Sequence, residues 1–472
     1  MSEDSRKPPV YSGIENLNEA FAFFESRTNL EKGFSPGNPN REYRLDRMRE
    51  LCAAFGNPQE SFRVVHLAGS KGKGSTAAYI AGVLHAAGRE VGVYASPHLM
   101  DYRERFRIEG KDFPEDTAFE TATMLLRRLP EVEGNLPGTG GATTFELLTL
   151  FAFLLFRASG CDTAVLETGL GGRLDATNVT AKPEAVVFTP IEKEHTEVLG
   201  SRLRDIALEK AGIIKGIPGC PVFSGYQHSS ASRVIRRETE KAGLKLGELT
   251  SLIRKISATG RNDGKFAWTL KWKNGREDVI HLNMGGRIQA ENAALALLVT
   301  EKLEPEIINT DKGRETTLKA LGEVVLPGRF QRLRQNPVVI IDGAHTPHSV
   351  AAVAEAFRQL TSGKSERKEN ERIRPILLFG SVEGKDYKAM ARKLCGGRHP
   401  HFREVIISTP GTFKPSNPSV VAESFRKTGA DVSLIPDPEE AWKTAIRRSE
   451  NIRPVLITGS FFMAGEIARL LH

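Results

Sequence analysis

Short apolar runs alternate with helix-compatible stretches along the first half of the chain. Phe62–Ala68 (FRVVHLA) is apolar and β-branched, and a glycine-rich loop and a helix-compatible stretch at Thr76–Ala87 follow it. Further runs of this kind predict short buried strands at Glu90–Ala95, Asp162–Glu167 and Glu184–Thr189. Nearly continuous apolar strands that alternate with helices are typical of a parallel sheet covered on both faces. The pattern therefore predicts the α/β class for this half.

The pattern changes after this half, where a β-hairpin is expected. From Phe266 to Leu282, two strand-like segments flank an Asn274-Gly275 turn. A helix is predicted over Ala290–Lys302, and a charged stretch at Pro305–Arg314 follows it. We place a domain boundary in that stretch, which predicts domains at residues 1–308 and 309–472.

The last part of the chain has its own alternation of strands and helices. Strands are expected at Pro337–Asp342, Pro375–Gly380, Glu404–Ser408, Asp431–Ile435 and Pro454–Thr458. Amphipathic stretches at His348–Leu360 and Glu439–Ser449 predict helices. Together they indicate a second, smaller, Rossmann-like α/β domain. Ser362–Arg374 is charged and almost free of apolar residues, so we expect an exposed and mobile insertion there.

The composition of the 472 residues is that of an ordinary globular protein, with 40% hydrophobic and 26% charged residues. It excludes collagen-like and globally disordered chains. Lys and Arg number 66 against 58 Asp and Glu, and the net charge of +8 suits anionic substrates such as nucleotides or polycarboxylates.

The sequence gives no signal for a membrane segment, a leader or a disulfide framework. The most apolar run, Leu147–Phe156, is about half of the roughly 20 residues that a membrane-spanning helix needs. The N-terminal segment MSEDSRKPPVYSG lacks an apolar core, and the cysteines form no CxxC pair. We therefore expect a cytoplasmic protein with reduced thiols.

Gly69–Thr76 (GSKGKGST) lies between a predicted strand and a predicted helix, which is the setting of a phosphate-binding loop. Glycines let backbone N–H groups approach phosphates, and a helix N-terminus favours negative charge. Lys73 would supply a cation to the β- and γ-phosphates. The spacing is shorter than that of a standard Walker A loop, and a flexible glycine-rich turn is the alternative interpretation.

Polar side chains follow several predicted strands. Ser96, Glu167 and His195 each come at or just after a strand end, where ligands of α/β proteins bind. A carboxylate such as Glu167 is costly to bury unless it is paired or binds a cation. The three side chains could therefore offer ligands to one Mg²⁺ beside a nucleotide. The structural alternatives are that Ser-Pro begins a loop, that the glycines after Glu167 bend the backbone, and that the histidine is structural.

Other residues stand out less by chemistry alone. The Gly-x-Gly spacing after the strand that ends at residue 167 allows a dinucleotide interpretation, but no clear acidic ribose partner follows. Lys210, taken by itself, has the pattern of an ordinary lysine on a helix surface. In the second half, Arg329 follows a Pro-Gly step, Asp342 ends an apolar strand, and Ser460 follows the last strand.

In combination, these motifs resemble the folylpolyglutamate synthase/dihydrofolate synthase family, within the ATP-dependent amide ligases that include the Mur ligases. The resemblance runs from about Leu51 to Leu471. The motifs that carry it are Gly69–Thr76, Ser96–Leu99, Thr144–Glu146, Glu167–Asn178, His195–Gly200, Glu209–Lys215, Gln289-x-x-Asn292, Pro327–Arg329, Asp342–His345 and Thr458–Ser460. It implies an N-terminal P-loop-type ATPase domain with a parallel sheet, followed by the smaller C-terminal α/β domain.

The resemblance implies ATP and Mg²⁺ as cofactors. ATP would be held by Ser70, Lys71, Gly72, Lys73, Gly74, Ser75, Asn292, Arg329, Asp342 and His345. Ser96, Glu167 and His195 would ligate Mg²⁺, in agreement with the strand-end argument. Lys210 matches a lysine that is carbamylated in this family, and the resulting carboxylate would help to bind a second Mg²⁺. A monovalent cation is a further expectation. Catalytic roles would fall to Lys73, His195, Lys210 and Arg329.

The resemblance also implies substrate contacts. The pterin pocket would comprise Thr143, Thr144, Phe145, Glu146, Leu174, Asp175 and Ala176. Ser26–Asn29 matches, less clearly, a stretch that touches pteroate, and Ser460 is the candidate for contact with glutamate. Four positions depart from the usual pattern of the family: Lys71 and Thr346 replace Asn, Glu194 replaces Asp, and Ile288 replaces His. None of these changes removes a ligand, although Lys71 adds charge beside the phosphates.

The implied reaction is acyl activation. ATP phosphorylates a carboxylate of pteroate or folate, the α-amine of L-glutamate attacks the acyl phosphate, and phosphate leaves as the amide forms. The expected partners are these small molecules, dihydropteroate included, with no nucleic acid and no membrane, and we expect a monomer.

Alternative functions stay open at this point. One is an enzyme with the folylpolyglutamate synthase activity only, and another is a Mur-like ligase with a different acid substrate. A nucleotide-binding regulator or a nucleic-acid-binding protein would need a basic stripe with interleaved aromatic residues, which a chain with 7% aromatic residues lacks.

Overall fold

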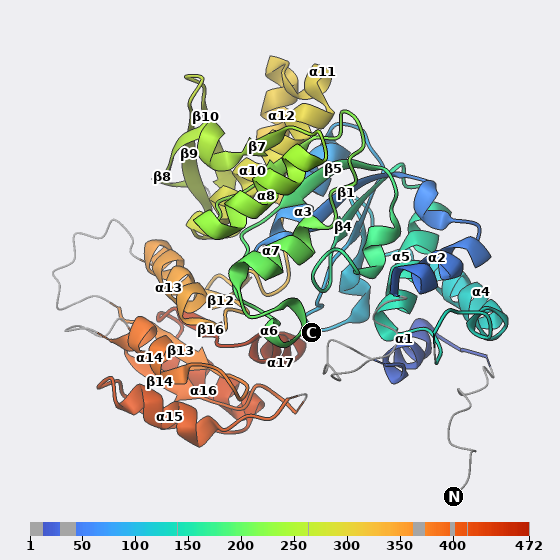
Figure 1. Cartoon of the computed structure of the whole chain (residues 1–472). Helices are drawn as coiled ribbons and strands as arrows, with labels where there is room; N and C mark the ends of the chain where they lie inside the picture. Colours follow the sequence, from blue (N-terminus) through green and yellow to red (C-terminus); the bar gives the residue numbers. More distant parts are fainter. Residues whose placement is uncertain are drawn as a thin grey trace, which may run out of the picture.

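The computed structural model describes residues 13–28, 44–138, 140–262, 264–361, 373–396, 402–412 and 414–471 (Figure 1). Asn29 and residues 362–372, which form most of the predicted insertion Ser362–Arg374, lie outside the described residues. Within the described part, the strands form three sheets. No helix in that part is long and apolar enough to cross a membrane.

A seven-stranded sheet forms the centre of the first half, in the order β3-β2-β4-β1-β5-β6-β7. Its strands are β1 (Arg63–Ala68), β2 (Val91–Tyr94), β3 (Phe106–Ile108), β4 (Thr163–Glu167), β5 (Pro183–Phe188), β6 (Val222–Ser224) and β7 (Leu246–Glu248). All neighbouring strands are parallel except β3, which runs antiparallel to β2. The predicted parallel sheet and its buried strands are confirmed.

Helices cover both faces of this sheet, because successive side chains of a strand point to opposite faces. The helices of the first half are α1 (Leu17–Ser26), α2 (Arg44–Ala54), α3 (Lys73–Ala86), α4 (Glu115–Glu133), α5 (Thr144–Ala158), α6 (Thr196–Leu199), α7 (Leu203–Ala211), α8 (Ser229–Lys241), α9 (Leu249–Leu252) and α10 (Arg287–Leu303). On one face, Val65 and Leu67 of β1 pack with α3 and α10, and on the other Val64 packs with α1, α2, α4 and α5.

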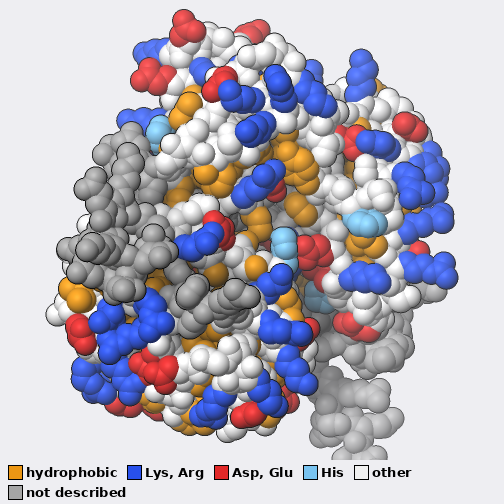
Figure 2. All heavy atoms as spheres, turned by 90° about the vertical axis from the view of Figure 1, so that its left-hand side faces the viewer, with side chains coloured by type: hydrophobic (Ala, Val, Ile, Leu, Met, Phe, Trp, Pro, Cys, Tyr) orange, Lys and Arg blue, Asp and Glu red, His pale blue; other side chains and the backbone are white. Residues whose placement is uncertain are grey.

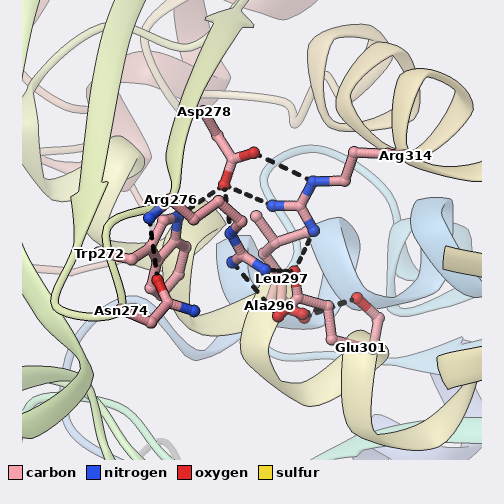
Figure 3. Close-up of polar contacts among 9 residues, drawn as sticks. Trp272, Asn274, Arg276, Asp278, Ala296, Leu297, Glu301 and Arg314 are labelled. Atoms are coloured by element: carbon pink, nitrogen blue, oxygen red, sulfur yellow. Dashed lines mark hydrogen bonds and ion pairs between the residues drawn. The ribbon is translucent and has the colours of Figure 1, made fainter. Parts of the chain in front are cut away.

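A three-stranded antiparallel sheet contains the predicted hairpin and is tied to α10 by buried charges (Figure 3). Its strands are β8 (Ile253–Asn262), β9 (Lys265–Trp272) and β10 (Glu277–Leu282). Trp272 Nε1 donates to Asp278 Oδ2 at 2.6 Å, and Arg314 Nε donates to Asp278 Oδ1 at 3.1 Å. Arg276 and Arg314 both pair with Glu301 on α10. Because a buried charge that loses its partner is strongly destabilising, this network holds the sheet and α10 together.

A six-stranded sheet forms the C-terminal part, in the order β11-β12-β16-β13-β14-β15 (lower left in Figure 1). Its strands are β11 (Gln331–Arg334), β12 (Val339–Ile341), β13 (Ile376–Phe379), β14 (Glu404–Ile407), β15 (Val432–Leu434) and β16 (Val455–Thr458). Only β11 is antiparallel to its neighbour. Its helices are α13 (Pro347–Thr361), α14 (Tyr387–Cys395), α15 (Pro418–Arg426), α16 (Pro438–Ser449) and α17 (Phe461–Arg469). The second α/β sheet is thus confirmed.

Two helices lie where the domain boundary is predicted, α11 (Pro305–Ile308) and α12 (Asp311–Glu323). Helix α12 packs against α3 and β10, which belong to the first half of the chain. We therefore propose that the boundary lies after α12 rather than at residue 308.

Leu99 joins the first half to the C-terminal part. It is buried in the same apolar cluster as Ile341 and Ile457 of the second sheet. A Cβ atom at Gly465 of α17 would come within 2.6 Å of the Leu99 carbonyl oxygen, so the two backbones approach closely. Within the first half of the chain, the Glu104 carboxylate accepts the backbone N–H of Leu99 at 2.7 Å. The loop after β2 is therefore fixed between the two parts.

Candidate active site

The segment between β1 and α3 is a tight loop at the start of a helix. Gly72, which caps α3, has a φ of 81°, in the left-handed region that favours glycine. The backbone N–H groups of Ser70 and Lys71 share the carbonyl oxygen of Pro190, at 2.8 and 3.2 Å. The loop is thereby fixed against the end of β5. The predicted strand-loop-helix setting is confirmed, and the binding of phosphates there stays a prediction.

Lys73, the first residue of α3, lies beside Glu167 at the end of β4. Lys73 Nζ is 3.4 Å from Glu167 Oε1 and donates to the carbonyl of Gly69 at 3.1 Å. Glu167 is 4% exposed, and its Oε2 has no hydrogen-bond partner among the described residues. Burial raises the pKa of Glu167, while Lys73, Arg329 and the Ser96 backbone oppose the rise. A buried carboxylate oxygen without a partner suits a divalent cation, so Glu167 fits the predicted Mg²⁺ site.

Lys210 on α7 is buried, and the interpretation of it as a surface lysine is wrong. The residue is 2% exposed, and its Nζ donates to Gly69 O at 2.7 Å and lies 2.9 Å from Glu194 Oε1. Burial lowers the pKa of Lys210, Glu194 partly offsets this, and Lys73 lowers the pKa further. Burial alone would raise the pKa of Glu194, but the cations Lys210 and Lys73 lower it. Packing of α7 against the phosphate loop, which periodicity does not show, explains the difference.

His195 lies at the N-terminus of α6 with a φ of 47°, a conformation uncommon for residues other than glycine. Its side chain is half exposed, and its Nδ1 is 4.0 Å from Glu197 Oε1. Within the described ranges, no three His, Cys, Asp or Glu side chains form a group that could hold a metal ion. The metal set of Ser96, Glu167 and His195 therefore stays a prediction, supported by the buried Glu167.

Asp342 directly follows β12, and its carboxylate binds the backbone of the surrounding loops. Its Oδ2 accepts the backbone N–H of Phe330 and its Oδ1 accepts that of Ala344, both at 2.8 Å. Burial raises the pKa of Asp342, and Arg329 and these N–H groups oppose the rise. The carboxylate thus holds the backbone next to Arg329 in place.

Arg329 and His345 bring the C-terminal part to the phosphate loop. The guanidinium carbon of Arg329 lies 4.3 Å from the centre of the Phe461 ring. Burial lowers the pKa of Arg329, and nearby carboxylates, Glu167 among them, oppose this. Burial lowers the pKa of His345 to about 4, and Lys71 adds to the effect. Since Glu167 and Lys71 belong to the first half of the chain, charges of the two parts act on one another here.

Asn292 of α10 lies against the phosphate loop. It is 3% exposed, and a Cβ atom at Gly72 would come within 2.6 Å of its Oδ1. Figure 2 shows hydrophobic side chains near the middle of the face turned to the viewer, with Lys and Arg side chains among and around them. The position of Asn292 beside the loop agrees with a nucleotide-binding role, which stays a prediction.

Phe145 lies in the first turn of α5 and packs against the turn that follows β4. Its ring centre is 5.9 Å from that of Tyr94, and a Cβ atom at Gly169 would come within 2.4 Å of its Cζ. The ring therefore lies directly over the backbone of Gly169. Phe145 is only partly buried, so part of the residue stays accessible, and its contact with a pterin stays a prediction.

The other predicted pocket residues on α5 have structural partners. Thr143 and Glu146 form a capping box at the start of the helix, which satisfies its free N–H groups. Glu146 also pairs with the buried Arg47 at 3.4 Å, and Thr144 Oγ1 donates to the carbonyl of Arg27 at 3.2 Å. Their sequence pattern thus has a structural explanation, and their contact with a pterin stays a prediction.

The Asp175 carboxylate holds the turn after β4 through hydrogen bonds to its backbone. Its Oδ2 accepts the N–H groups of Gly169 and Leu170 at 3.0 and 2.9 Å. Its Oδ1 accepts the N–H of Thr177 at 3.1 Å and the hydroxyl of Thr177 at 2.6 Å. Leu174 and Ala176 flank this residue in the sequence, and their contact with a pterin stays a prediction.

Two serines, Ser381 and Ser460, follow the neighbouring parallel strands β13 and β16 of the six-stranded sheet. Ser460 is 2% exposed, donates to Gly380 O at 2.9 Å and caps α17 by accepting the N–H of Met463 at 3.0 Å. Its contact with glutamate stays a prediction. Ser381 was not predicted, yet its buried Oγ has no partner among the described residues. The signal for it was the Gly-Ser pair after an apolar strand, which Gly380-Ser381 shares with Gly459-Ser460.

Comparison with known proteins agrees with this arrangement. Residues 117–300 match the Mur ligase middle domain, and residues 328–461 match the Mur ligase glutamate ligase domain. The dihydrofolate synthase/folylpolyglutamate synthase of Bacillus subtilis is 31% identical over 94% of this chain and 96% of its own length. The folylpolyglutamate synthase of Lacticaseibacillus casei is 30% identical over 90% of this chain and 94% of its own length.

A solved structure is similar to this chain over most of its length. Mycobacterium tuberculosis folylpolyglutamate synthase, complexed with ADP and AMPPCP, has a TM-score of 0.77 and 27% identity to this chain. The match covers 90% of this chain and 95% of that one, so it includes both parts of the fold.

Proposed function

Because the chain belongs to the folylpolyglutamate synthase/dihydrofolate synthase family of Mur-type ligases, we propose that it is an ATP-dependent ligase that adds L-glutamate to dihydropteroate and to folates. The observation that carries this proposal is the meeting of three groups in one site. Lys73 of the phosphate loop lies 3.4 Å from the buried Glu167, and both Lys73 and Arg329 of the C-terminal part lower the pKa of that carboxyl. The paired name of the Bacillus subtilis relative supports both activities.

The physical obstacle in this reaction is charge. A substrate carboxylate must approach a γ-phosphate that is already anionic. Lys73 and Lys71 in the loop and Arg329 from the opposite side supply fixed positive charge there. Such preorganised charge stabilises the transition state without a covalent intermediate on the protein. Because Arg329 comes from the C-terminal part, approach of the two parts would also exclude water from the acyl phosphate.

The buried Glu167 carboxylate suits Mg²⁺. When bound, it would neutralise phosphate charge and polarise the γ-phosphoryl group. Glu167, with its unpartnered Oε2, would hold it together with Ser96 and His195. A carbamylated Lys210 would help to hold a second ion, and the burial that lowers the Lys210 pKa favours the neutral amine that carbamylation requires.

The pterin and L-glutamate would be contacted by different parts of the fold. Phe145 and the turn at Gly169 offer an aromatic face and an exposed backbone to the pterin ring. Ser460 and the unpartnered Ser381 lie at the edge of the second sheet, where L-glutamate would enter. We expect the enzyme to act as a monomer in the cytoplasm.

Product analysis tests this proposal directly. Purified protein, ATP, Mg²⁺ and L-glutamate are incubated with dihydropteroate or with tetrahydrofolate in separate reactions, and the products are identified by mass spectrometry. We expect one added glutamate on dihydropteroate and one or more on tetrahydrofolate. Addition to tetrahydrofolate alone would restrict the function to folylpolyglutamate synthase. ATP hydrolysis with neither acid ligated would point to another acid substrate.

A further inference from the structure

His66 is a buried titratable group at the centre of β1 for which the proposed reaction has no use. Its Nε2 lies 2.8 Å from Thr177 Oγ1, and both residues are fully buried. Thr177 Oγ1 lies 2.6 Å from Asp175 Oδ1. Asp175 Oδ2 accepts the N–H groups of Gly169 and Leu170 at 3.0 and 2.9 Å. A continuous chain of hydrogen bonds therefore runs from the central strand to the turn after β4.

The number of available protons decides which group donates in each of these hydrogen bonds. Asp175 accepts N–H groups on both oxygens, as an ionised carboxylate does, so the single hydroxyl proton of Thr177 goes to Asp175. The hydroxyl must then accept from His66, which places the imidazole proton on Nε2. His66 Nδ1 is buried with no partner among the described residues, so a proton on that nitrogen would have no acceptor there. Burial lowers the pKa of His66 to about 3, and Lys215 adds to the effect, so the ring is neutral.

The turn that this chain holds forms one side of the proposed pterin pocket. Phe145 lies so close to Gly169 that a Cβ atom there would come within 2.4 Å of its ring. The phosphate loop is held separately, through the carbonyl of Pro190. A small shift of the turn would therefore alter the surface beside Phe145 and leave the phosphate loop in place.

We propose that His66 is a positioning residue that acts through Thr177 and Asp175 to hold the Gly169–Leu170 turn against Phe145, and so sets the affinity for the pterin ring of the acid substrate. The identity of that substrate rests on the proposed function. The hydrogen-bond chain itself does not.

A matched pair of substitutions at Thr177 tests the proposal. Thr177→Ser keeps the hydroxyl, whereas Thr177→Val keeps the shape and removes it. We expect Thr177→Val to raise the KM for dihydropteroate about tenfold with little change in the KM for ATP, and Thr177→Ser to stay near the wild type. Equal behaviour of the two variants, or an equal rise in both KM values, would overturn the proposal.

A double-mutant cycle then connects His66 to the same effect. His66→Met removes the donor, and the double variant with Thr177→Val should bind dihydropteroate no worse than Thr177→Val alone, since the connection is already broken. Additive losses would mean that His66 acts independently of Thr177. If His66→Met fails to fold, the Thr177 pair and the protonation of the His66 ring in the wild type together decide the question.

Nitrogen-15 NMR of labelled histidine gives a readout that does not depend on activity. We expect one imidazole, absent from His66→Gln, that is protonated on Nε2 and does not titrate between about pH 5 and 8. A proton on Nδ1, or titration in that range, would refute the proposed series of hydrogen bonds. Because this signal is read without turnover, an inactive wild type would contradict the proposed function and leave the His66 arrangement testable.

Discussion

Lys73 Nζ lies 3.4 Å from Glu167 Oε1, so the cation of the phosphate loop and the buried carboxylate at the end of β4 occupy one site. They meet because β1 and β4 are parallel neighbours whose carboxyl ends share one edge of the sheet. A phosphate would pair with Lys73, and a divalent cation would pair with Glu167. Binding a nucleotide together with its metal would therefore replace one ion pair by two, which favours joint binding over binding of either alone.

Replacement of Lys73 should abolish turnover. We expect Lys73→Ala to lower kcat at least about a hundredfold, because it removes the cation at the N-terminus of α3. The melting temperature should stay near that of the wild type. The exposed Lys241→Ala serves as the control and should be fully active. Normal product formation by Lys73→Ala at saturating ATP would exclude a phosphate-binding role.

Loss of the predicted metal ligands should appear in the Mg²⁺ dependence. Glu167→Gln keeps the size of the side chain and removes its charge, and His195→Ala removes the imidazole. Both variants should need a higher Mg²⁺ concentration for half-maximal activity, with a much smaller change in the KM for glutamate. Mg²⁺ titrations that coincide with the wild type would show that these residues are not ligands.

Truncation of Phe145 should change the KM for dihydropteroate more than the KM for ATP. Phe145→Ala removes an aromatic face whose stacking contributes about 0.5–1.5 kcal/mol beyond area burial, which predicts a rise of up to about tenfold in the KM for dihydropteroate. The KM for ATP should change little. Comparable changes in both values would assign Phe145 to the apolar core instead.

Lys210 should be carbamylated in the active enzyme. Carbamylation requires the neutral amine, and burial of Lys210 lowers its pKa in the required direction. Lys210→Ala should be nearly inactive, and acetate should partly restore activity by supplying the missing carboxylate. In crystals grown with bicarbonate and Mg²⁺-ATP, density should extend beyond Nζ by a planar three-atom group. Well-ordered density that ends at Nζ would refute carbamylation.

Stability should fall on the acid side because of buried histidines. Burial lowers the pKa of His66 from 6.5 to about 3 and that of His345 from 6.5 to about 4. Below about pH 6.5 the unfolded chain binds these protons and the folded chain does not, so stability decreases as the pH drops. Each histidine contributes a slope of up to about 1.4 kcal/mol per pH unit.

The corresponding experiment compares the wild type with His66→Gln in urea at several pH values. The variant should lose stability less steeply between about pH 6.5 and 4.5, because one of the two protons is no longer taken up on unfolding. Parallel pH profiles would show that His66 is not a neutral buried group.

The strands and the strand-end groups could be predicted from the sequence, whereas the packing of side chains could not. Continuous apolar runs fix parallel strands, and the shared edge of such a sheet then brings Lys73 and Glu167 together. The burial of Lys210 depends on how α7 packs against a loop far away in the sequence. For the same reason, nothing in the pattern distinguished the capping role of Thr143 from a ligand contact, and the unpartnered Ser381 was missed.

The contact between Leu99 and Gly465 has a thermodynamic consequence. Leu99 lies in the same short loop as Ser96, so the position of the C-terminal part and the geometry at Ser96 are mechanically joined. If Ser96 binds the cation as predicted, the free energy of cation binding and that of closing the two parts must be coupled. By reciprocity, each changes the other by the same amount. A residue larger than glycine at position 465 would then weaken cation affinity from outside the site, and the C-terminal part would act as an effector of the metal.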